Sequence, residues 1–162
     1  RCWMVTVRHS TSVSSDYLTG TERTISEEGL NNSSAKLLPI GTILVSSRAT
    51  IGRVAIARIP TATNQGFKNI VIQDHQRVLS EFVAYMMRFL TPRLEALATG
   101  GTFKEFSKSA LSGIEIPLPP IEVQREIVIN IEAHQRRIEE LKNEIAEREQ
   151  KIKLSIDRVW TG

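Results

Sequence analysis

The sequence predicts an α+β protein: a small β-rich domain with short helices, followed by one long C-terminal coiled-coil helix. Short runs rich in β-branched residues predict strands at residues 42–47, 53–58 and 69–74, each bounded by Gly, Pro, Asn or Asp. Toward the C-terminus, apolar residues recur every seven positions, as in a coiled coil. Prolines separate these two parts, and we place the domain boundary there, giving residues 1–116 and 117–162.

One helix is expected inside the first domain, over residues 80–99. Ser80 is a favourable N-cap residue, and Pro92 must kink or restart the helix because proline lacks an amide donor. The apolar residues fall on one face at helical spacing, which indicates packing against a core. They are Phe82, Val83, Met86, Leu90, Leu94 and Leu97.

A proline cluster marks the joint between the two parts. Pro117, Pro119 and Pro120 follow the strand-like run "SGIEI" at residues 112–116 and prevent it from continuing. Pro120 fits the first position of a helix, and Glu122 lies in the first turn, where the helix dipole favours an anion. The long helix is therefore expected to begin here.

This helix carries a narrow apolar seam. Of the intervening seam positions, only Leu141 is apolar, while His134, Arg148 and Ser155 are polar. Polar seam residues fix register at some cost in stability. A helix of some 40 residues makes a rod on the order of 60 Å long. We predict that it pairs in an antiparallel homodimer through Ile131, Ile138, Leu141, Ile145, Ile152 and Val159.

Composition limits the classes of protein to consider. The chain has 162 residues, 41% of them hydrophobic, and a mean hydropathy of -0.15, which suits one globular domain with an appendage. No apolar run approaches the roughly 20 residues that cross a bilayer. Cys2 is the single cysteine, so an internal disulfide is excluded. We expect no membrane partner and a cytoplasmic location.

Charge and loop chemistry favour nucleic acid as a partner. Residues 1–120 hold 13 Lys and Arg against 9 Asp and Glu, whereas residues 121–162 hold 8 against 9. Polar side chains gather in loops at residues 46–52, 63–69 and 100–108, although ordinary turn chemistry would also explain each loop alone. Arg, Asn and Gln read bases, and hydroxyls and Lys hold phosphates. The candidate DNA contacts are Arg8, Ser46, Ser47, Arg48, Thr50, Asn64, Gln65, Lys68, Thr102 and Lys104.

Catalytic motifs are scarce. The sequence contains no phosphate-binding GxxxxGK[ST], no GxGxxG and no HExxH. We assign no catalytic residues, metal ligands or cofactor to this chain from its motifs. Two alternatives stay open: a coiled-coil adaptor that binds protein, and a small metal-dependent nuclease using Asp74, Glu81 or Glu105.

Several stretches together resemble the specificity subunit of type I restriction-modification systems. They are "TERTISEEGLNNSSAKLLPIGTILVSSRATIGRVAI", "TNQGFK", "GGTFKEFSKSALSGIEIPLPPIEVQREIV" and the long helix that follows. The chain looks like one target recognition domain and one spacer helix, where family members usually carry two of each. Residues 8–22 match no stretch known to us.

The resemblance implies a non-catalytic subunit that reads double-stranded DNA. Its helix would space two reading domains along a bipartite target. By the same resemblance, it would recruit methyltransferase subunits, which carry S-adenosylmethionine, and an endonuclease subunit that translocates DNA.

Overall fold

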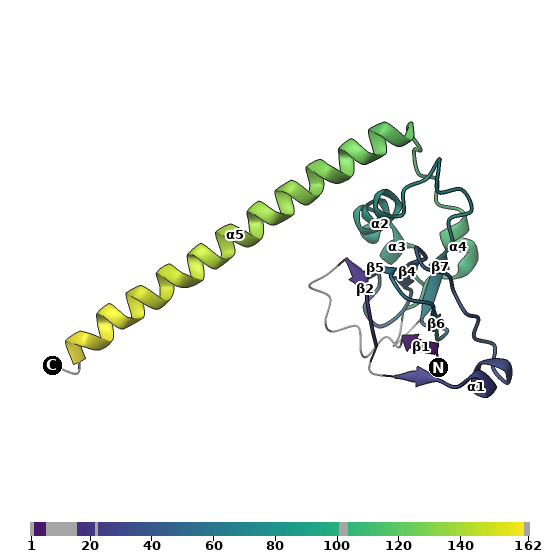
Figure 1. Ribbon diagram of the computed structural model, residues 1–162, viewed down its shortest axis with the longest axis horizontal. Helices are drawn as coiled ribbons and strands as arrows, with labels where there is room; N and C mark the ends of the chain where they lie inside the picture. The colour runs from purple at the N-terminus through teal and green to yellow at the C-terminus, as the bar shows by residue number, and fades with distance from the viewer. Residues whose placement is uncertain (1, 6–15, 22, 101–103, 161–162) are drawn as a thin grey trace. The chain divides into compact units, whose positions relative to one another are not determined.

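The structure, a computed structural model, describes residues 2–5, 16–21, 23–100 and 104–160 (Figure 1). The chain forms two compact units, Arg1–Gln124 and Arg125–Gly162. The division falls inside the long C-terminal helix, whose first residues belong to the first unit. The predicted domain boundary after residue 116 remains a prediction.

A four-stranded sheet lies at the centre of the first unit, in the order β2-β5-β4-β7. Strand β4 (Ile43–Ser46) is entirely buried and pairs antiparallel with β5 (Val54–Ala57) and β7 (Phe67–Ile70). Strand β2 (Tyr17–Leu18) runs parallel to β5. The predicted strands at 42–47 and 53–58 are confirmed, and both contribute apolar side chains to the core.

The third predicted strand was placed too late in the sequence. It was expected at residues 69–74, but β7 begins at Phe67, opposite Ser46, and ends at Ile70, opposite Ile43. The chain then turns at Asp74, whose carboxylate accepts a hydrogen bond from the Gln76 amide at 2.9 Å. The length of β4 therefore sets the length of β7.

A smaller sheet has three strands in the order β3-β1-β6. Strand β1 (Cys2–Val5) pairs antiparallel with β3 (Thr24–Ile25) and parallel with β6 (Thr61–Thr63). Neither β1 nor β3 was predicted, because two to four residues are too few to show an alternating pattern.

Short helices are held at their starts by serine caps. In α1 (Glu27–Asn31) the Ser26 hydroxyl accepts a hydrogen bond from the Gly29 amide at 3.0 Å. In α4 (Lys108–Ser112) the Ser107 hydroxyl accepts from the Ala110 amide at 3.0 Å. Such caps satisfy amides that have no partner within the helix.

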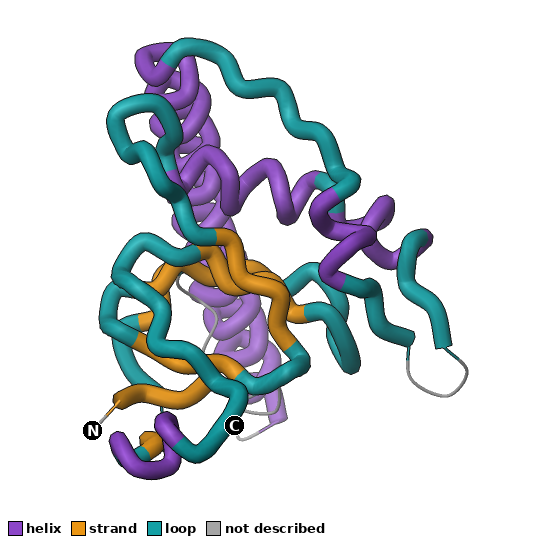
Figure 2. The backbone as a smooth tube through the Cα atoms, turned by 90° about the vertical axis from the view of Figure 1, so that its right-hand side faces the viewer, coloured by secondary structure: helices purple, strands orange, loops and turns teal. Residues whose placement is uncertain are grey.

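Two consecutive helices follow the larger sheet. Helix α2 (Ser80–Phe89) packs on β4 and β5, and α3 (Thr91–Ala96) continues after a break at Leu90 (Figure 2). The break confirms the effect expected of Pro92, which lies in the first turn of α3. Ser80 is not the N-cap as predicted. It is the first helical residue, and its hydroxyl donates to the Gly41 carbonyl at 3.0 Å.

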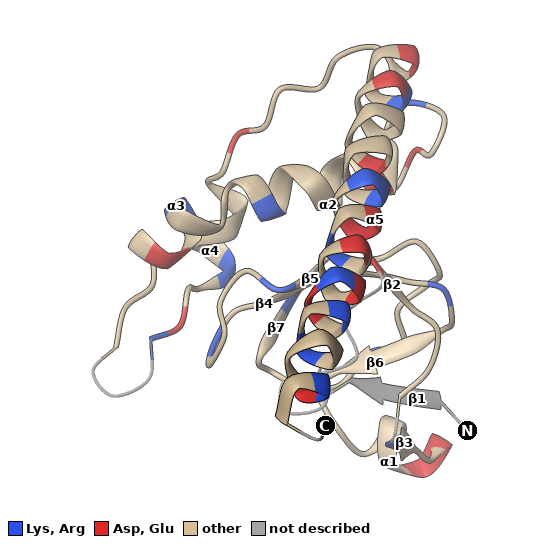
Figure 3. Cartoon of the chain, turned by 90° about the vertical axis from the view of Figure 1, so that its left-hand side faces the viewer, with Lys and Arg blue, Asp and Glu red and all other residues tan. Residues whose placement is uncertain are grey.

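The long helix α5 (Ile121–Trp160) has 40 residues and begins directly after Pro120, as expected from the proline cluster. The run at residues 112–116 is not a strand, because Ser112 ends α4 and Gly113 caps it. Figure 3 shows Lys and Arg interspersed with Asp and Glu along α5. Among the described residues, no helix is both long enough and apolar enough to cross a membrane. The fold class is confirmed: a small mixed sheet domain with short helices and one long C-terminal helix.

Candidate nucleic-acid interface

Three loops meet at Ser47, the residue that follows β4. Its amide donates to the Gly66 carbonyl at 2.8 Å, and its own carbonyl accepts from the Phe106 amide at 3.2 Å. Phe106 is completely buried and anchors its segment in the core. The segments 47–52, 63–68 and 104–106, which lie within the predicted loops 46–52, 63–69 and 100–108, therefore form one connected region that we call the three-loop surface.

The first of these loops is closed by Ser46. Its hydroxyl donates to the Thr50 carbonyl and accepts from the Arg53 amide at 3.0 Å. Ala49 and Gly52 have positive φ values of 63° and 81°, which let the chain turn back into β5. The loop therefore has a defined path, with Ala49 and Thr50 exposed at its tip.

The second loop is shaped by Asn64. Its side-chain oxygen accepts from the Gly66 amide at 2.9 Å, an Asx turn in which the side chain replaces a backbone partner. Gln65, at the corner of this turn, is exposed. The turn therefore uses the Asn64 side chain internally and leaves the Gln65 side chain at the surface.

An ion pair joins the second loop to the third. The Lys68 ammonium lies 2.8 Å from a carboxylate oxygen of Glu105 and 3.1 Å from the Ser47 hydroxyl. The Ser47 hydroxyl in turn donates to Glu105 at 3.2 Å. The hydrogen bond from Lys68 is the main cause that lowers the pKa of Glu105 below its ordinary value, so this carboxyl is ionised at neutral pH.

The predicted DNA contacts divide into three groups. Four side chains have hydrogen-bond partners inside the protein: Ser46, Ser47, Asn64 and Lys68. Four others are exposed or half-buried: Arg48, Thr50, Gln65 and Lys104. Two lie outside the described residues: Arg8 and Thr102. Ser46 and Ser47 are only 1% and 0% exposed, and their hydroxyls form hydrogen bonds inside the protein, so their DNA contacts remain a prediction.

The predicted dimer seam is largely open to solvent in the isolated chain. Ile131 is half-buried, and the other seam residues are 40% to 81% exposed. They are Ile138, Leu141, Ile145, Ile152 and Val159. The polar seam residue Arg148 pairs with Glu144 at 2.6 Å, four residues earlier on the same helix. The seam thus offers apolar side chains for a partner, which is compatible with the predicted interface.

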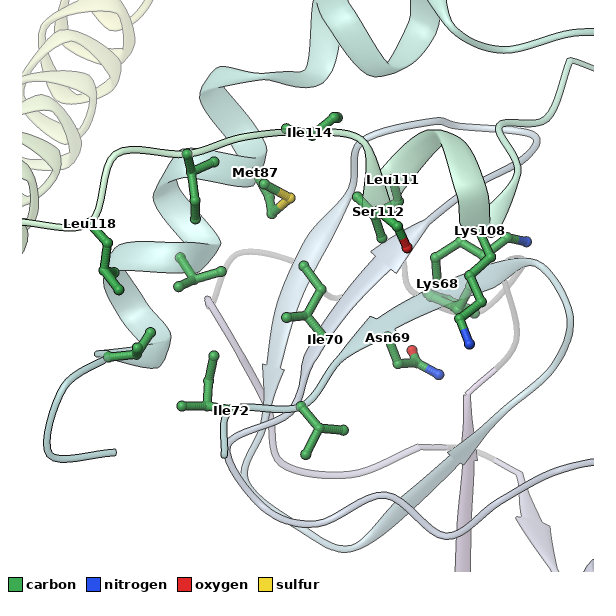
Figure 4. A pocket seen from close by; sticks show the side chains of 15 residues that line it. Lys68, Asn69, Ile70, Ile72, Met87, Lys108, Leu111, Ser112, Ile114 and Leu118 are labelled. Carbon is green, nitrogen blue, oxygen red and sulfur yellow. The ribbon is translucent and has the colours of Figure 1, made fainter. Parts of the chain in front are cut away.

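An apolar pocket of about 720 Å³ lies beside β7, between that strand, α2 and the segment leading to the prolines (Figure 4). Its lining is mostly aliphatic, with Lys68 and Lys108 near one end of it. Aliphatic side chains carry no hydrogen-bonding groups for base edges, so we do not assign this pocket to DNA reading. Apolar lining comes from Ile70, Ile72, Met87, Leu111, Ile114 and Leu118.

The acidic residues of the nuclease alternative are held in separate places. Glu81 pairs with Arg58 at 3.3 Å and accepts from the Tyr17 hydroxyl at 3.2 Å. Burial, followed by the charge of Glu81, raises the pKa of Tyr17. Glu105 pairs with Lys68, and Asp74 closes its own turn. Within the described part of the chain, no cluster of three or more His, Cys, Asp or Glu could hold a metal ion.

One anchor near the candidate interface was missed from the sequence. Asp16 accepts from the Tyr85 hydroxyl at 2.9 Å and pairs with Arg88 at 2.6 Å, and Arg88 also donates to the Val54 carbonyl at 3.0 Å. Helix α2 thereby holds the start of β2 against β5. Residues about 70 positions apart give no local signal of such a pairing.

Residues 7–150 match the family model of the type I restriction modification DNA specificity domain. The match covers most of the chain, and the chain therefore belongs to this family.

Curated relatives include the specificity subunit of the type I restriction enzyme MjaIX from Methanocaldococcus jannaschii. It is 40% identical over 148 residues, which cover 89% of this chain and 33% of the relative. The EcoR124I/EcoR124II specificity subunit from Escherichia coli is 30% identical over 110 residues, covering 64% of this chain and 27% of the relative. The chain thus spans about a third of the length of these relatives or less.

Solved structures agree with this assignment. The HsdS subunit from Thermoanaerobacter tengcongensis is similar over 67% of this chain and 25% of its own, with a TM-score of 0.56 and 28% identity. A chain from a structural study of the assembly and conformational transition of the type I R-M system gives a TM-score of 0.61 at 28% identity. That match covers 75% of this chain and 29% of the other.

Proposed function

We propose that this chain is a sequence-specific DNA-recognition module of a type I restriction-modification system, and that the three-loop surface reads one half of a bipartite target. The observation that carries the proposal is the joining of three polar loops at Ser47 within a chain of the DNA specificity family. The first unit contains the excess of positive charge, which attracts the phosphate backbone.

The exposed and half-buried side chains of this surface have the chemistry for reading DNA. Arg48 suits bidentate hydrogen bonds to guanine, and Gln65 suits adenine. Thr50 and Lys104 suit phosphate oxygens. Each of the four lies on a loop that hydrogen bonds hold in place, which lets the set act as one reading surface.

The module is non-catalytic in this proposal, and its partners supply the chemistry. Methyltransferase subunits would bring S-adenosylmethionine, and an endonuclease subunit that translocates DNA would complete the complex. The module would direct both to the target. The place of action would be the cytoplasm, where such a system meets cellular DNA.

The long helix would set the distance between two reading surfaces. Burial of each seam isoleucine stabilises a paired helix by about 1.5 to 3 kcal/mol relative to exposure, enough over the seam to offset the cost of association. In the proposed homodimer, a second copy of the chain supplies the partner helix. An antiparallel pair is two-fold symmetric, so its two heads would read an interrupted palindrome.

Binding to duplex DNA at several salt concentrations tests this function. If Z phosphates are contacted, log K should fall against log salt with a slope of roughly -0.9Z. Arg48→Ala should lose about 1 to 3 kcal/mol of base discrimination, whereas Lys104→Ala should weaken binding to all sequences alike. Failure to bind duplex at any salt concentration would favour the adaptor alternative. Metal-dependent nicking by the chain alone would favour the nuclease.

A further inference from the structure

We propose that Lys68 and Glu105 are positioning residues that determine sequence specificity without touching DNA, by locking the three loops into one arrangement. The inference rests on the function proposed above. It reverses the role that the sequence suggested for Lys68, which was a phosphate contact. The reversal follows from how the hydrogen-bonding groups of the Lys68 ammonium are used.

All the donors of Lys68 have partners within the protein. An ammonium has three N–H groups, and three acceptors surround this one: Glu105 at 2.8 Å, the Ser47 hydroxyl at 3.1 Å and the Gln65 carbonyl at 3.3 Å. The Lys68 side chain is only 17% exposed. To reach a phosphate, Lys68 would have to leave these acceptors, and the Glu105 carboxylate would lose its ion pair.

The charge of Lys68 is also matched locally. Glu105 lies in direct contact with it and is itself 37% exposed at its side chain. The two opposite charges lie so close together that their electric fields largely cancel at the position of a DNA phosphate. The pair therefore adds little to the attraction of DNA. The pair is therefore a poor phosphate site.

Each loop of the three-loop surface is connected to this pair. Lys68 bonds the carbonyl of Gln65, a candidate base-reading residue. Glu105 directly follows Lys104, and its backbone forms an isolated antiparallel bridge with Arg48. Loss of the pair would free the exposed side chains to move relative to one another, and base readout requires fixed geometry. Phosphate attraction, by contrast, tolerates such movement.

The test compares Lys68→Met and Glu105→Gln with the wild-type chain. A duplex selected from a random pool by the wild-type chain is the specific probe, and a scrambled duplex of the same length is the random probe. Two readouts are taken: the ratio of the two dissociation constants, and the salt slope on random DNA. Lys104→Ala is the matched control, because it removes an exposed lysine of the same surface.

Positioning predicts that both variants lower the specificity ratio about tenfold or more. Each variant leaves one charge of the pair uncompensated, so affinity for random DNA should fall slightly in Lys68→Met and rise slightly in Glu105→Gln. The double variant should lose no more than the worse single variant, because both act through one pair. Lys104→Ala should reduce the salt slope on random DNA by about 0.9 and leave the specificity ratio unchanged. Thermal unfolding checks that each variant is folded. If Lys68→Met does not fold, the test rests on Glu105→Gln alone, because glutamine keeps the shape of the glutamate side chain.

Two results would overturn the inference while the proposed function stands: a Lys68→Met variant that keeps the specificity ratio while it weakens binding to all sequences, or a Glu105→Gln variant with an unchanged ratio. A wild-type chain that prefers no duplex over any other would overturn the proposed function, and the inference with it.

Discussion

The side-chain amide of Gln124 hydrogen bonds the backbone of Leu79 across 45 positions of the sequence. Its oxygen accepts from the Leu79 amide at 2.9 Å, and its nitrogen donates to the carbonyls of Arg77 at 2.9 Å and Pro119 at 2.8 Å. Gln124 is completely buried, although it belongs to a helix that is otherwise mostly exposed. The first turn of α5 is thereby tied to the segment that enters α2.

Gln124→Leu should destabilise the first unit, because it leaves backbone groups of Arg77, Leu79 and Pro119 without their partner. A buried polar group left unsatisfied costs about 1 to 3 kcal/mol, so we expect a loss on the order of 3 kcal/mol in the free energy of unfolding. Urea unfolding measures it. Gln150→Leu makes the same change at an exposed position of α5 outside the seam and should have little effect. Equal stability of the two variants would contradict this account of the joint.

Gly52→Ala should also destabilise the fold. Gly52 has a φ of 81°, and a Cβ atom there would lie 2.2 Å from the Thr91 methyl carbon. Strained backbone together with overlap predicts a loss of about 2 kcal/mol or more. Thermal unfolding measures it, with Gly20→Ala as the control, because a Cβ at Gly20 meets no atom within 4 Å. If the melting temperatures of Gly52→Ala and Gly20→Ala fall by the same small amount, the close approach of Thr91 to Gly52 does not constrain the fold.

The ion pair at Glu105 should make stability depend on pH in acid. The folded-state pKa of Glu105 is lowered from 4.5, chiefly by the hydrogen bond from Lys68, so its contribution is fully present above about pH 4.5 and is lost as the pH falls through the folded value. The wild-type chain should therefore be more stable than Glu105→Gln near neutral pH, and the difference should shrink in acid. Urea unfolding between about pH 7 and about pH 3 measures it. Glu115→Gln removes an exposed carboxylate and is the control. A difference that is constant with pH would count against the ion pair.

Ile145→Lys should convert a dimer to a monomer. It places a charge at the centre of the seam, where a partner helix would bury it, and removes apolar burial worth about 1.5 to 3 kcal/mol in each copy. Sedimentation at micromolar concentration measures the change. Glu147→Lys adds a lysine to the same helix outside the seam and should leave the dimer intact. A monomeric wild-type chain under these conditions would refute the homodimer.

Local patterns in the sequence were sufficient to predict the helices and strands whose apolar residues recur with strong periodicity. The runs around Ile43 and Ile56 and the start of α5 after Pro120 lie where patterns placed them. The predicted helical stripe is buried at Phe82 and Leu94, but its last member, Leu97, is exposed because it follows the end of α3. Short pairings were missed, because β1 and β3 join only through contacts far apart in the sequence.

The candidate site was predicted in outline and not in the role of each residue. Loop composition marked three segments that Ser47 does bring together. Which hydroxyl or lysine faces inward depends on partners distant in sequence, as when Lys68 meets Glu105. No spacing rule reveals such a partner, so residue type suggested a DNA contact where the structure shows an internal ion pair.

The most direct test of the central claim is selection of duplex DNA from a random pool by the purified 162-residue chain, followed by sequencing of the bound fraction. We predict enrichment of one interrupted inverted repeat, bound more tightly than scrambled duplex by about a thousandfold or more at physiological salt. Enrichment of no sequence, with equal affinity for selected and scrambled duplex, would contradict the claim that this chain reads DNA.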